Sequence, residues 1–304
     1  MTAAERLLVV ICGPTASGKS GVSFEMAAAF PLRLLSADSM QVYRGMDIGT
    51  AKPLLPQRAE VGLLDLVDPG EAFSAGRFAA EAANLAETAW LRGQTPCFVG
   101  GSGLYLDAVL HGLSEMPKIP AAVRQEVSQT PLPDLLSELR SSDPAGAEKL
   151  DQKNPRRVQR AVEVLRASGK PLSLWQAAPK TGMLRPNRIL MLGMDPGRTE
   201  LARAIRERNR HAMESGWIDE TKRLAEVFGE EKVRSTGAIG YSELLDVLAG
   251  RQDFETARGA IEIATAQYAR RQRTWFRKDA TIEWFVPADK GGILKRIGEF
   301  LNAK

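Results

Sequence analysis

Short apolar runs alternate with helical patterns through the first third of the chain. The candidate strands are the runs at 7–12, 32–36, 63–67 and 96–99. Apolar runs of this length are typical of buried strands, whereas the alanine-rich, periodic stretch 75–92 predicts a helix. Because strands that alternate with helices form parallel sheets, this region predicts an α/β fold with a parallel sheet flanked by helices.

The alternation breaks after about residue 117. Between 117 and 175 the pattern contains helical pieces interrupted by prolines, and no convincing strand. A strand pattern returns at 188–192, and 198–277 is helix-like with glycine breaks near Gly216, Gly229–Gly240 and Gly250. The expected domains are an α/β core made of residues 1–116 and 183–304, and an all-helical insertion at 117–182.

Composition narrows the class of protein. Of 304 residues, 44% are hydrophobic and 26% are charged, as in ordinary globular proteins. No apolar run reaches about 18 residues, so we expect no membrane span. The first strand begins directly after Met1–Arg6, which leaves no room for a signal peptide, and Cys12 and Cys97 fall in predicted strands as reduced thiols. A cytoplasmic location is expected. The net charge of +4 permits a nucleic-acid partner without requiring one.

Residues 13–20 read G-P-T-A-S-G-K-S and match the phosphate-loop pattern G-x-x-x-x-G-K-[ST]. The motif stands between a predicted strand and a helix-compatible stretch, so its backbone N–H groups would converge on an anion at a helix N-terminus. Lys19 would add a positive charge, and Ser20 a hydroxyl ligand for a phosphate-bound Mg²⁺. The full match favours this interpretation over a glycine-rich turn with an incidental lysine. The predicted phosphate-binding residues are Gly13, Pro14, Thr15, Ala16, Ser17, Gly18, Lys19 and Ser20.

Two further segments follow predicted strands, at the sheet edge where parallel α/β folds bind ligands. In S-A-D-S-M-Q-V-Y (36–43), Asp38 is a candidate general base or Mg²⁺ ligand, although an aspartate often simply starts a turn. In G-G-S-G-L-Y (100–105), the glycines would let the backbone approach a ligand, and Ser102 could hydrogen-bond a substrate. Tight strand-to-helix turns use the same residues.

The segment N-P-R-R-V-Q-R-A-V-E at 154–163 opens a predicted helix. A buried stripe is expected at Val158, Ala161, Val162 and Leu165. Arg156, Arg160 and Glu163 lie on another face, which is either open to a partner or simply solvated.

Basic and aromatic residues are interleaved at 268–278, where no acid occurs before Asp279. Such a pattern suits contacts with nucleic-acid phosphates and stacking on bases. A helix with Trp275 and Phe276 in the core and its arginines in water would look the same.

Taken together, seven ordered blocks resemble the bacterial tRNA dimethylallyltransferases, which isopentenylate the adenosine next to the anticodon. The blocks are G-P-T-A-S-G-K-S at 13–20, D-S-M-Q-V-Y at 38–43, R-G-M-D-I-G-T-A-K-P at 44–53, G-G-S-G-L-Y at 100–105, N-P-R-R-V-Q-R-A-V-E-V at 154–164, A-I-G-Y at 238–241 and Q-Y-A-R-R-Q-R-T-W-F-R at 267–277. Ser20 and Ser102 stand where many members have threonine, and each keeps the hydroxyl.

The resemblance implies that the donor is dimethylallyl diphosphate, which explains a phosphate loop without a residue to orient an attacking water. Lys19 and a Ser20-bound Mg²⁺ would stabilise the diphosphate leaving group, with Arg223 as a further clamp. The nucleophile would be the exocyclic amine of adenine. Asp38 would be its general base, and Ser102 would help to hold the base. ATP also suits the motif alone, but the expected ligand is a prenyl diphosphate.

The resemblance also implies that the partner is the tRNA anticodon stem-loop, clasped by the helical insertion, with no membrane partner and the protein acting as a monomer. The expected tRNA-binding residues are Asp38, Ser39, Met40, Gln41, Gln159, Arg160, Ala161, Val162, Glu163, Arg270, Arg271 and Arg273. Three alternatives are an adenylate isopentenyltransferase acting on free nucleotides, a small-molecule kinase and a non-enzymatic RNA-binding adaptor. A free nucleotide needs no clasp, so the insertion argues against the first.

Overall fold

The computed structural model describes residues 5–177, 180 and 182–303. The chain divides into two compact units. One consists of Met1–Leu110 with Met183–Lys304, and the other of His111–Gly182.

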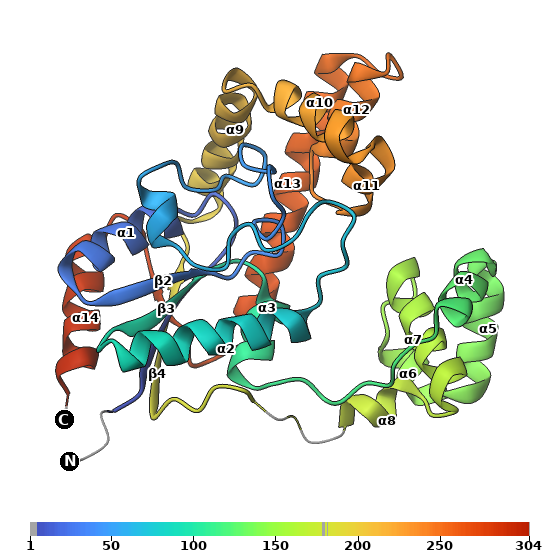
Figure 1. The fold of residues 1–304 in the computed structure, drawn as a ribbon, viewed down its shortest axis with the longest axis horizontal. Helices are drawn as coiled ribbons and strands as arrows, with labels where there is room; N and C mark the ends of the chain where they lie inside the picture. The colour runs from blue at the N-terminus through green and yellow to red at the C-terminus, as the bar shows by residue number, and fades with distance from the viewer. Residues whose placement is uncertain (1–4, 178–179, 181, 304) are drawn as a thin grey trace. The chain divides into compact units, whose positions relative to one another are not determined.

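The first unit contains a five-stranded parallel sheet in the order β2-β3-β1-β4-β5 (Figure 1). Its strands are β1 (Leu7–Cys12), β2 (Leu32–Ser36), β3 (Thr95–Gly100), β4 (Arg188–Met194) and β5 (Glu283–Phe285). In the central strand β1 every residue is buried, and Val9 pairs with Cys97 on one side and with Leu190 on the other. The predicted α/β class is confirmed.

Helices cover both faces of this sheet. Apolar side chains of α1 (Lys19–Ala29) and α14 (Lys290–Asn302) form one core with alternate residues of β1, such as Val9 and Ile11. Leu8 and Val10 point to the opposite face and are also fully buried. There α2 (Ala75–Leu91) packs against β3 and α3 (Gly103–Leu110), and Phe78 stacks on Tyr105 at 4.2 Å between ring centroids.

The first unit continues with helices between β4 and β5. They are α9 (Arg198–Glu214), α10 (Trp217–Phe228), α11 (Glu230–Ser235), α12 (Tyr241–Leu248) and α13 (Phe254–Phe276). Gly216, Gly229, Gly240 and Gly250 all have positive φ and stand at helix boundaries, so the predicted glycine breaks are confirmed.

The described part of the second unit is helical. Its helices are α4 (Ala121–Gln129), α5 (Leu132–Ser142), α6 (Pro144–Lys149), α7 (Pro155–Ser168) and α8 (Leu172–Ala177). Pro144 and Pro155 occupy first helical positions, where the missing N–H costs nothing. Leu135, Leu139 and Val158 belong to a core of its own. The all-helical insertion is therefore present, and its compact unit begins at His111 rather than at residue 117.

The strand expected at 63–67 is wrong. Leu63 and Asp65 have positive φ values of 68° and 57°, which no regular strand can contain. Isolated bridges flank the segment: Gly62 pairs with Leu35 of β2, and Val67 pairs with Tyr43, which lies outside the strands. The short strand β5 was not expected. No helix in the described ranges is long and apolar enough to cross a membrane.

Candidate functional site

The phosphate loop joins β1 to α1, as the sequence predicts. Gly18 adopts a left-handed conformation with φ of 84°, and α1 begins at Lys19, so the first amides of the helix open toward the loop. Thr15 to Ser20 line a pocket of about 180 Å³ together with Asp38, Gln41 and Arg208. The Lys19 Nζ donates a hydrogen bond to the Pro14 carbonyl at 2.5 Å. We call this the phosphate pocket. It presents backbone amides and the cations Lys19 and Arg208 to an anion.

The protonation state of Lys19 depends on its burial and on the neighbouring carboxylate of Asp38. Burial lowers the pKa of Lys19 to about 8, against the opposing effect of the Asp38 carboxylate. The free protein therefore holds an ammonium group here below pH 8 and loses it above.

This shift predicts a pH dependence. For a diphosphate donor, log(kcat/KM) should fall with a slope of about −1 above pH 8, because kcat/KM reports the ionisation of the free enzyme. A Lys19→Arg variant stays charged at these pH values, so it should lack this decline even if its activity is lower. Initial rates between pH 6.5 and 9.5, at donor and RNA concentrations below their KM values, test this. The same decline in the arginine variant would assign it to another group.

Asp38 follows β2 and lies beside the phosphate loop. Its Oδ1 accepts a hydrogen bond from the Met40 N–H at 2.8 Å, so the turn-forming interpretation of this aspartate is also correct. Ser102 Oγ accepts from the Ser39 N–H at 2.9 Å, and its hydroxyl lies 3.2 Å from Ser39 Oγ. A Cβ at Gly100 would lie 2.1 Å from the Ala37 carbonyl oxygen, so glycine is required there. Ser102 thus supports the turn that carries Asp38.

Two residues that sequence reasoning missed connect the parts of the site. Gln272 of α13 is 5% exposed; its Oε1 accepts from the Thr15 N–H at 2.8 Å, and its Nε2 donates to the Gly101 carbonyl at 3.0 Å. Arg208 of α9 donates to Thr15 Oγ1 and, at 3.3 Å, to the Gly49 carbonyl. Burial lowers the pKa of Arg208. The ordinary pKa of a guanidinium is so high that the side chain nevertheless stays charged.

Arg223, the predicted second clamp, lies exposed on α10 and does not line the phosphate pocket. Its role stays a prediction, and the geometry favours Arg208 for it.

A second pocket, the reaction pocket, has a volume of about 210 Å³ and shares Thr15, Asp38, Thr50 and Arg208 with the phosphate pocket. Its further lining residues are Ser39, Met40, Gly49, Asn209, Trp217, Gly237, Ala238, Ile239, Thr265, Tyr268 and Arg271. Burial, reinforced by the charge of Asp38, raises the pKa of Tyr268 to about 12 and keeps its hydroxyl protonated. Among the residues that line both pockets, Asp38 is the carboxylate.

The arginines of α13 divide between two surfaces. Arg271 lines the reaction pocket, whereas Arg270 and Arg273 line a groove of about 900 Å³ together with side chains of α9. Within that groove Arg273 and Arg277 each donate to Asp195 Oδ2 at 2.9 Å. The lining combines basic side chains with apolar ones, and basic side chains are the groups that contact nucleic-acid phosphates.

Comparisons with known proteins agree with this arrangement. A sequence profile described as IPP transferase matches residues 41–279. A tRNA dimethylallyltransferase from Geobacter sulfurreducens is 39% identical over 283 residues, or 91% of each chain. One from Methylococcus capsulatus is 39% identical over 293 residues, or 93% of each chain. The chain belongs to the tRNA dimethylallyltransferase family.

Solved structures extend the likeness to the fold. The full-length tRNA isopentenylpyrophosphate transferase from Bacillus halodurans matches with a TM-score of 0.70 and 34% identity, over 98% of this chain and 96% of that one. A eukaryotic dimethylallyltransferase acting on tRNA matches with a TM-score of 0.81 and 25% identity, over 99% of this chain and 80% of that one. The resemblance inferred from the seven sequence blocks is confirmed.

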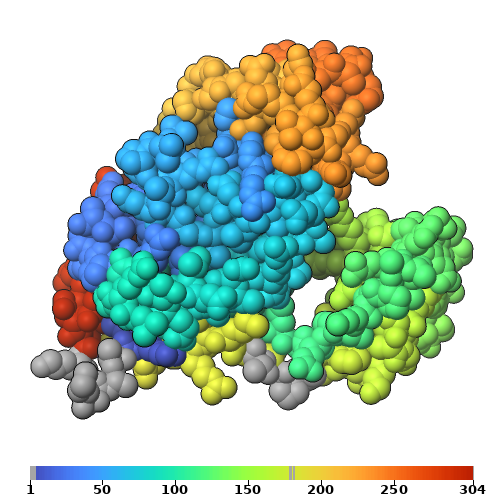
Figure 2. Space-filling view, in the orientation of Figure 1, coloured from blue at the N-terminus to red at the C-terminus, as the bar shows by residue number. Residues whose placement is uncertain are grey.

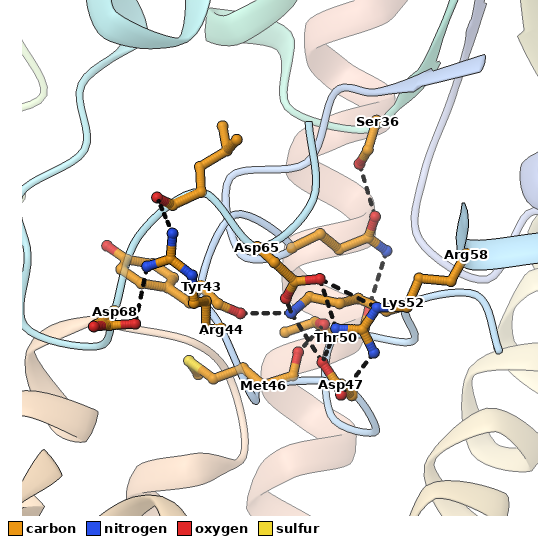
Figure 3. A network of polar contacts seen from close by, with 12 residues as sticks. Ser36, Tyr43, Arg44, Met46, Asp47, Thr50, Lys52, Arg58, Asp65 and Asp68 are labelled. Atoms are coloured by element: carbon orange, nitrogen blue, oxygen red, sulfur yellow. Dashed lines mark hydrogen bonds and ion pairs between the residues drawn. The ribbon is translucent and has the colours of Figure 1, made fainter. Parts of the chain in front are cut away.

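The loop between β2 and α2 contributes lining residues to both pockets. Lys52, whose side chain is fully buried, donates to Asp47 Oδ1 at 2.9 Å and to Asp65 Oδ1 at 2.7 Å, and Arg58 bridges the same two carboxylates (Figure 3). This network fixes the chain on both sides of Thr50, which lines both pockets.

Glu220 of α10 holds the same loop from the other side. Its carboxylate accepts the N–H groups of Asp47 at 3.0 Å and Ile48 at 2.8 Å, and also the Tyr241 hydroxyl at 2.7 Å. In the space-filling view, the segment after β2 (blue) and the helices α10–α12 (orange) form one continuous surface (Figure 2). The wall of the site is therefore joined to the helical part of the first unit.

The predicted tRNA-binding block on α7 has two kinds of residue. Gln159, Arg160 and Glu163 are partly exposed, and Arg160 lies 3.4 Å from Glu163. Ala161 and Val162 are buried in the core of the second unit at 2% and 0% exposure. Helical periodicity turns these two side chains inward, so they support the helix from the core, and their place in the tRNA-binding set stays a prediction.

The donor set at the phosphate pocket fits a magnesium ion that arrives with a diphosphate. Ser20 lines the pocket, and the described residues contain no group of three or more His, Cys, Asp or Glu side chains that could hold a metal. Mg²⁺ is usually held by one or two protein oxygens, substrate phosphates and waters, which is the combination available here.

Proposed function

We propose that this chain transfers a dimethylallyl group from dimethylallyl diphosphate to the exocyclic N6 amine of the adenosine immediately 3′ of the tRNA anticodon, and releases diphosphate. The observation that carries this proposal is the pair of pockets that meet at Asp38. One pocket offers amides and cations to a diphosphate. The other combines apolar side chains with polar groups, as a prenyl chain and an adenine require together.

In the proposed reaction the amine nitrogen forms a bond to the allylic carbon, and the carbon–oxygen bond to diphosphate breaks. Lys19, Arg208 and the loop amides stabilise the charge that develops on the leaving oxygen. Mg²⁺, held through Ser20, would neutralise further charge on the diphosphate. Asp38 accepts the proton that the amine loses, and Ser102 and Gln272 position the two backbone segments that carry these groups.

The adenosine must leave the stack of the anticodon loop to reach such a pocket. Extrusion from a single-stranded loop costs less than extrusion from a duplex. We propose that the protein acts as a monomer. Because its substrate is cellular tRNA, we place the protein in the cytoplasm.

Mass analysis of tRNA tests the activity. Bulk tRNA incubated with the protein, dimethylallyl diphosphate and Mg²⁺ should gain one dimethylallyl group on one adenosine. Parallel reactions with AMP in place of tRNA, and with γ-labelled ATP in place of the prenyl donor, should show no transfer. Prenylated AMP would favour the free-nucleotide alternative, and label transfer would favour a kinase.

We further propose that the second unit clasps the anticodon loop. Replacing 111–182 by a flexible linker should weaken binding of an anticodon stem-loop RNA by at least about 100-fold, since the cost of losing several phosphate contacts is large. Binding of dimethylallyl diphosphate to the first unit, which has its own core, should be unchanged. Unchanged RNA affinity with intact donor binding would show that the second unit is not the clasp.

A further inference from the structure

The reaction pocket is lined by both polar and apolar side chains, and we call the apolar ones together its apolar side. Its polar lining includes Asp38, Tyr268 and Arg271, which suit the N–H groups and ring nitrogens of adenine. Its large apolar lining residues are Met40, Trp217 and Ile239. In a prenyl diphosphate the hydrocarbon is the part that gains from leaving water. The tail of the donor therefore belongs on the apolar side.

Trp217 belongs to that apolar side and stands at the N-terminus of α10. It is 2% exposed, and its ring packs against Tyr241 in an edge-on arrangement with 5.7 Å between centroids. A side chain so enclosed has few alternative rotamers, so the wall that it forms is stiff.

Two glycines fix the position of the indole ring. A Cβ at Gly49 would lie 2.2 Å from Trp217 Nε1, and a Cβ at Gly240 would lie 2.3 Å from Trp217 Cη2 and Cζ2. The ring therefore lies directly against the backbone of the loop after β2 and of the segment before α12. It cannot move in either direction without displacing main chain.

The indole ring is also connected to the phosphate loop through Gly49 and Arg208. Gly49, which touches the indole, accepts a hydrogen bond through its carbonyl from Arg208 at 3.3 Å. Arg208 in turn contacts Thr15 of the phosphate loop. Arg208 therefore links the phosphate loop to the backbone against which the Trp217 ring packs.

The available space is small. The reaction pocket has about 210 Å³ for both an adenine edge and a prenyl tail, whereas pockets for drug-sized ligands measure ~300–1,000 Å³. We propose that Trp217 is the residue that sets the length of the prenyl chain, ending the pocket after one isoprene unit. This inference rests on the proposed function, because it assumes a prenyl donor.

The test compares two donors, dimethylallyl diphosphate and geranyl diphosphate, with an anticodon stem-loop RNA as acceptor. The wild-type protein should use the geranyl donor far less efficiently. Trp217→Leu and Trp217→Ala should raise the ratio of geranyl to dimethylallyl kcat/KM by about tenfold or more, within the range that a few methylenes are worth in a fitted pocket. Trp217→Phe, which keeps a smaller ring, should give an intermediate ratio and covers the case in which the smaller variants do not fold.

Leu224→Ala is the matched control. Leu224 lies on the same helix and is 5% exposed, but it does not line the pocket. Its truncation loosens α10 without lengthening the apolar side, so the donor ratio should stay at the wild-type value.

The outcomes separate the two proposals. Dimethylallyl transfer by the wild type, with an unchanged donor ratio in every Trp217 variant, overturns the chain-length role alone. A ratio that rises equally in Leu224→Ala, or a wild type that already uses both donors, overturns it too. A wild type that transfers neither group overturns the proposed function and this inference with it.

Discussion

Replacing Asp38 with asparagine or alanine is expected to lower the single-turnover rate of prenyl transfer by about 10²–10⁴-fold, the usual contribution of a general base. Asp38 is the carboxylate that lines both pockets, where the amine and the allylic carbon would meet. The exocyclic amine of adenine is a weak nucleophile because its lone pair is delocalised into the ring. Its attack therefore depends on removal of the proton.

The Asp38→Asn variant distinguishes loss of the general base from loss of the turn that Asp38 stabilises. Asparagine keeps an oxygen that can accept the Met40 N–H now bound by Asp38 Oδ1 at 2.8 Å, but it cannot take a proton. Affinities for the stem-loop RNA and for the donor should stay within a few-fold of wild type. Asp68→Asn is a control in the same loop region, because Asp68 pairs with Arg44 at the surface. Near-normal turnover in Asp38→Asn would contradict the general-base role.

The phosphate loop and Asp38 could be predicted from the sequence because their signals are local. An eight-residue motif between a strand and a helix has few other structures available to it, and the end of β2 places Asp38 at the binding edge of the sheet. The prediction of a strand at 63–67 is wrong because the structure there depends on contacts with residues outside the segment. The apolar spacing of the segment mimics a strand, but Asp65 pairs with the side chains of Lys52 and Arg58 and has left-handed backbone, neither of which the spacing reveals.

Gln272 and Arg208 could not be found by local pattern. Gln272 reaches Thr15 across 257 positions of sequence, and Arg208 is one of several arginines in α9, where no motif singles it out. The sequence predicts Ala161 and Val162 as tRNA-binding residues because they belong to the block at 154–164 that resembles the family. The block also contains the core positions of α7, so resemblance alone could not separate contact from support.

A Lys52→Met variant is expected to lose about 3–5 kcal/mol of unfolding free energy, the usual cost of breaking a buried ion pair from one side. The Lys52 side chain is fully buried between Asp47 and Asp65. Burial by itself would raise the pKa of Asp47, but hydrogen bonds from Arg58 and Lys52 outweigh it and lower the pKa. Without the ammonium group, two carboxylates share one guanidinium.

Thermal unfolding measures the loss of Lys52 directly. At about 2–4 °C per kcal/mol for a domain of this size, Tm should fall by ~6–20 °C. Lys290→Met is the matched control, since Lys290 pairs with Glu25 at 2.6 Å on the surface and exposed pairs contribute about 0–1 kcal/mol. Because Lys52 fixes the loop that carries Thr50, the KM for the donor should rise at temperatures where the variant is still folded. Equal Tm values for the two variants would mean that Arg58 alone holds the carboxylates together.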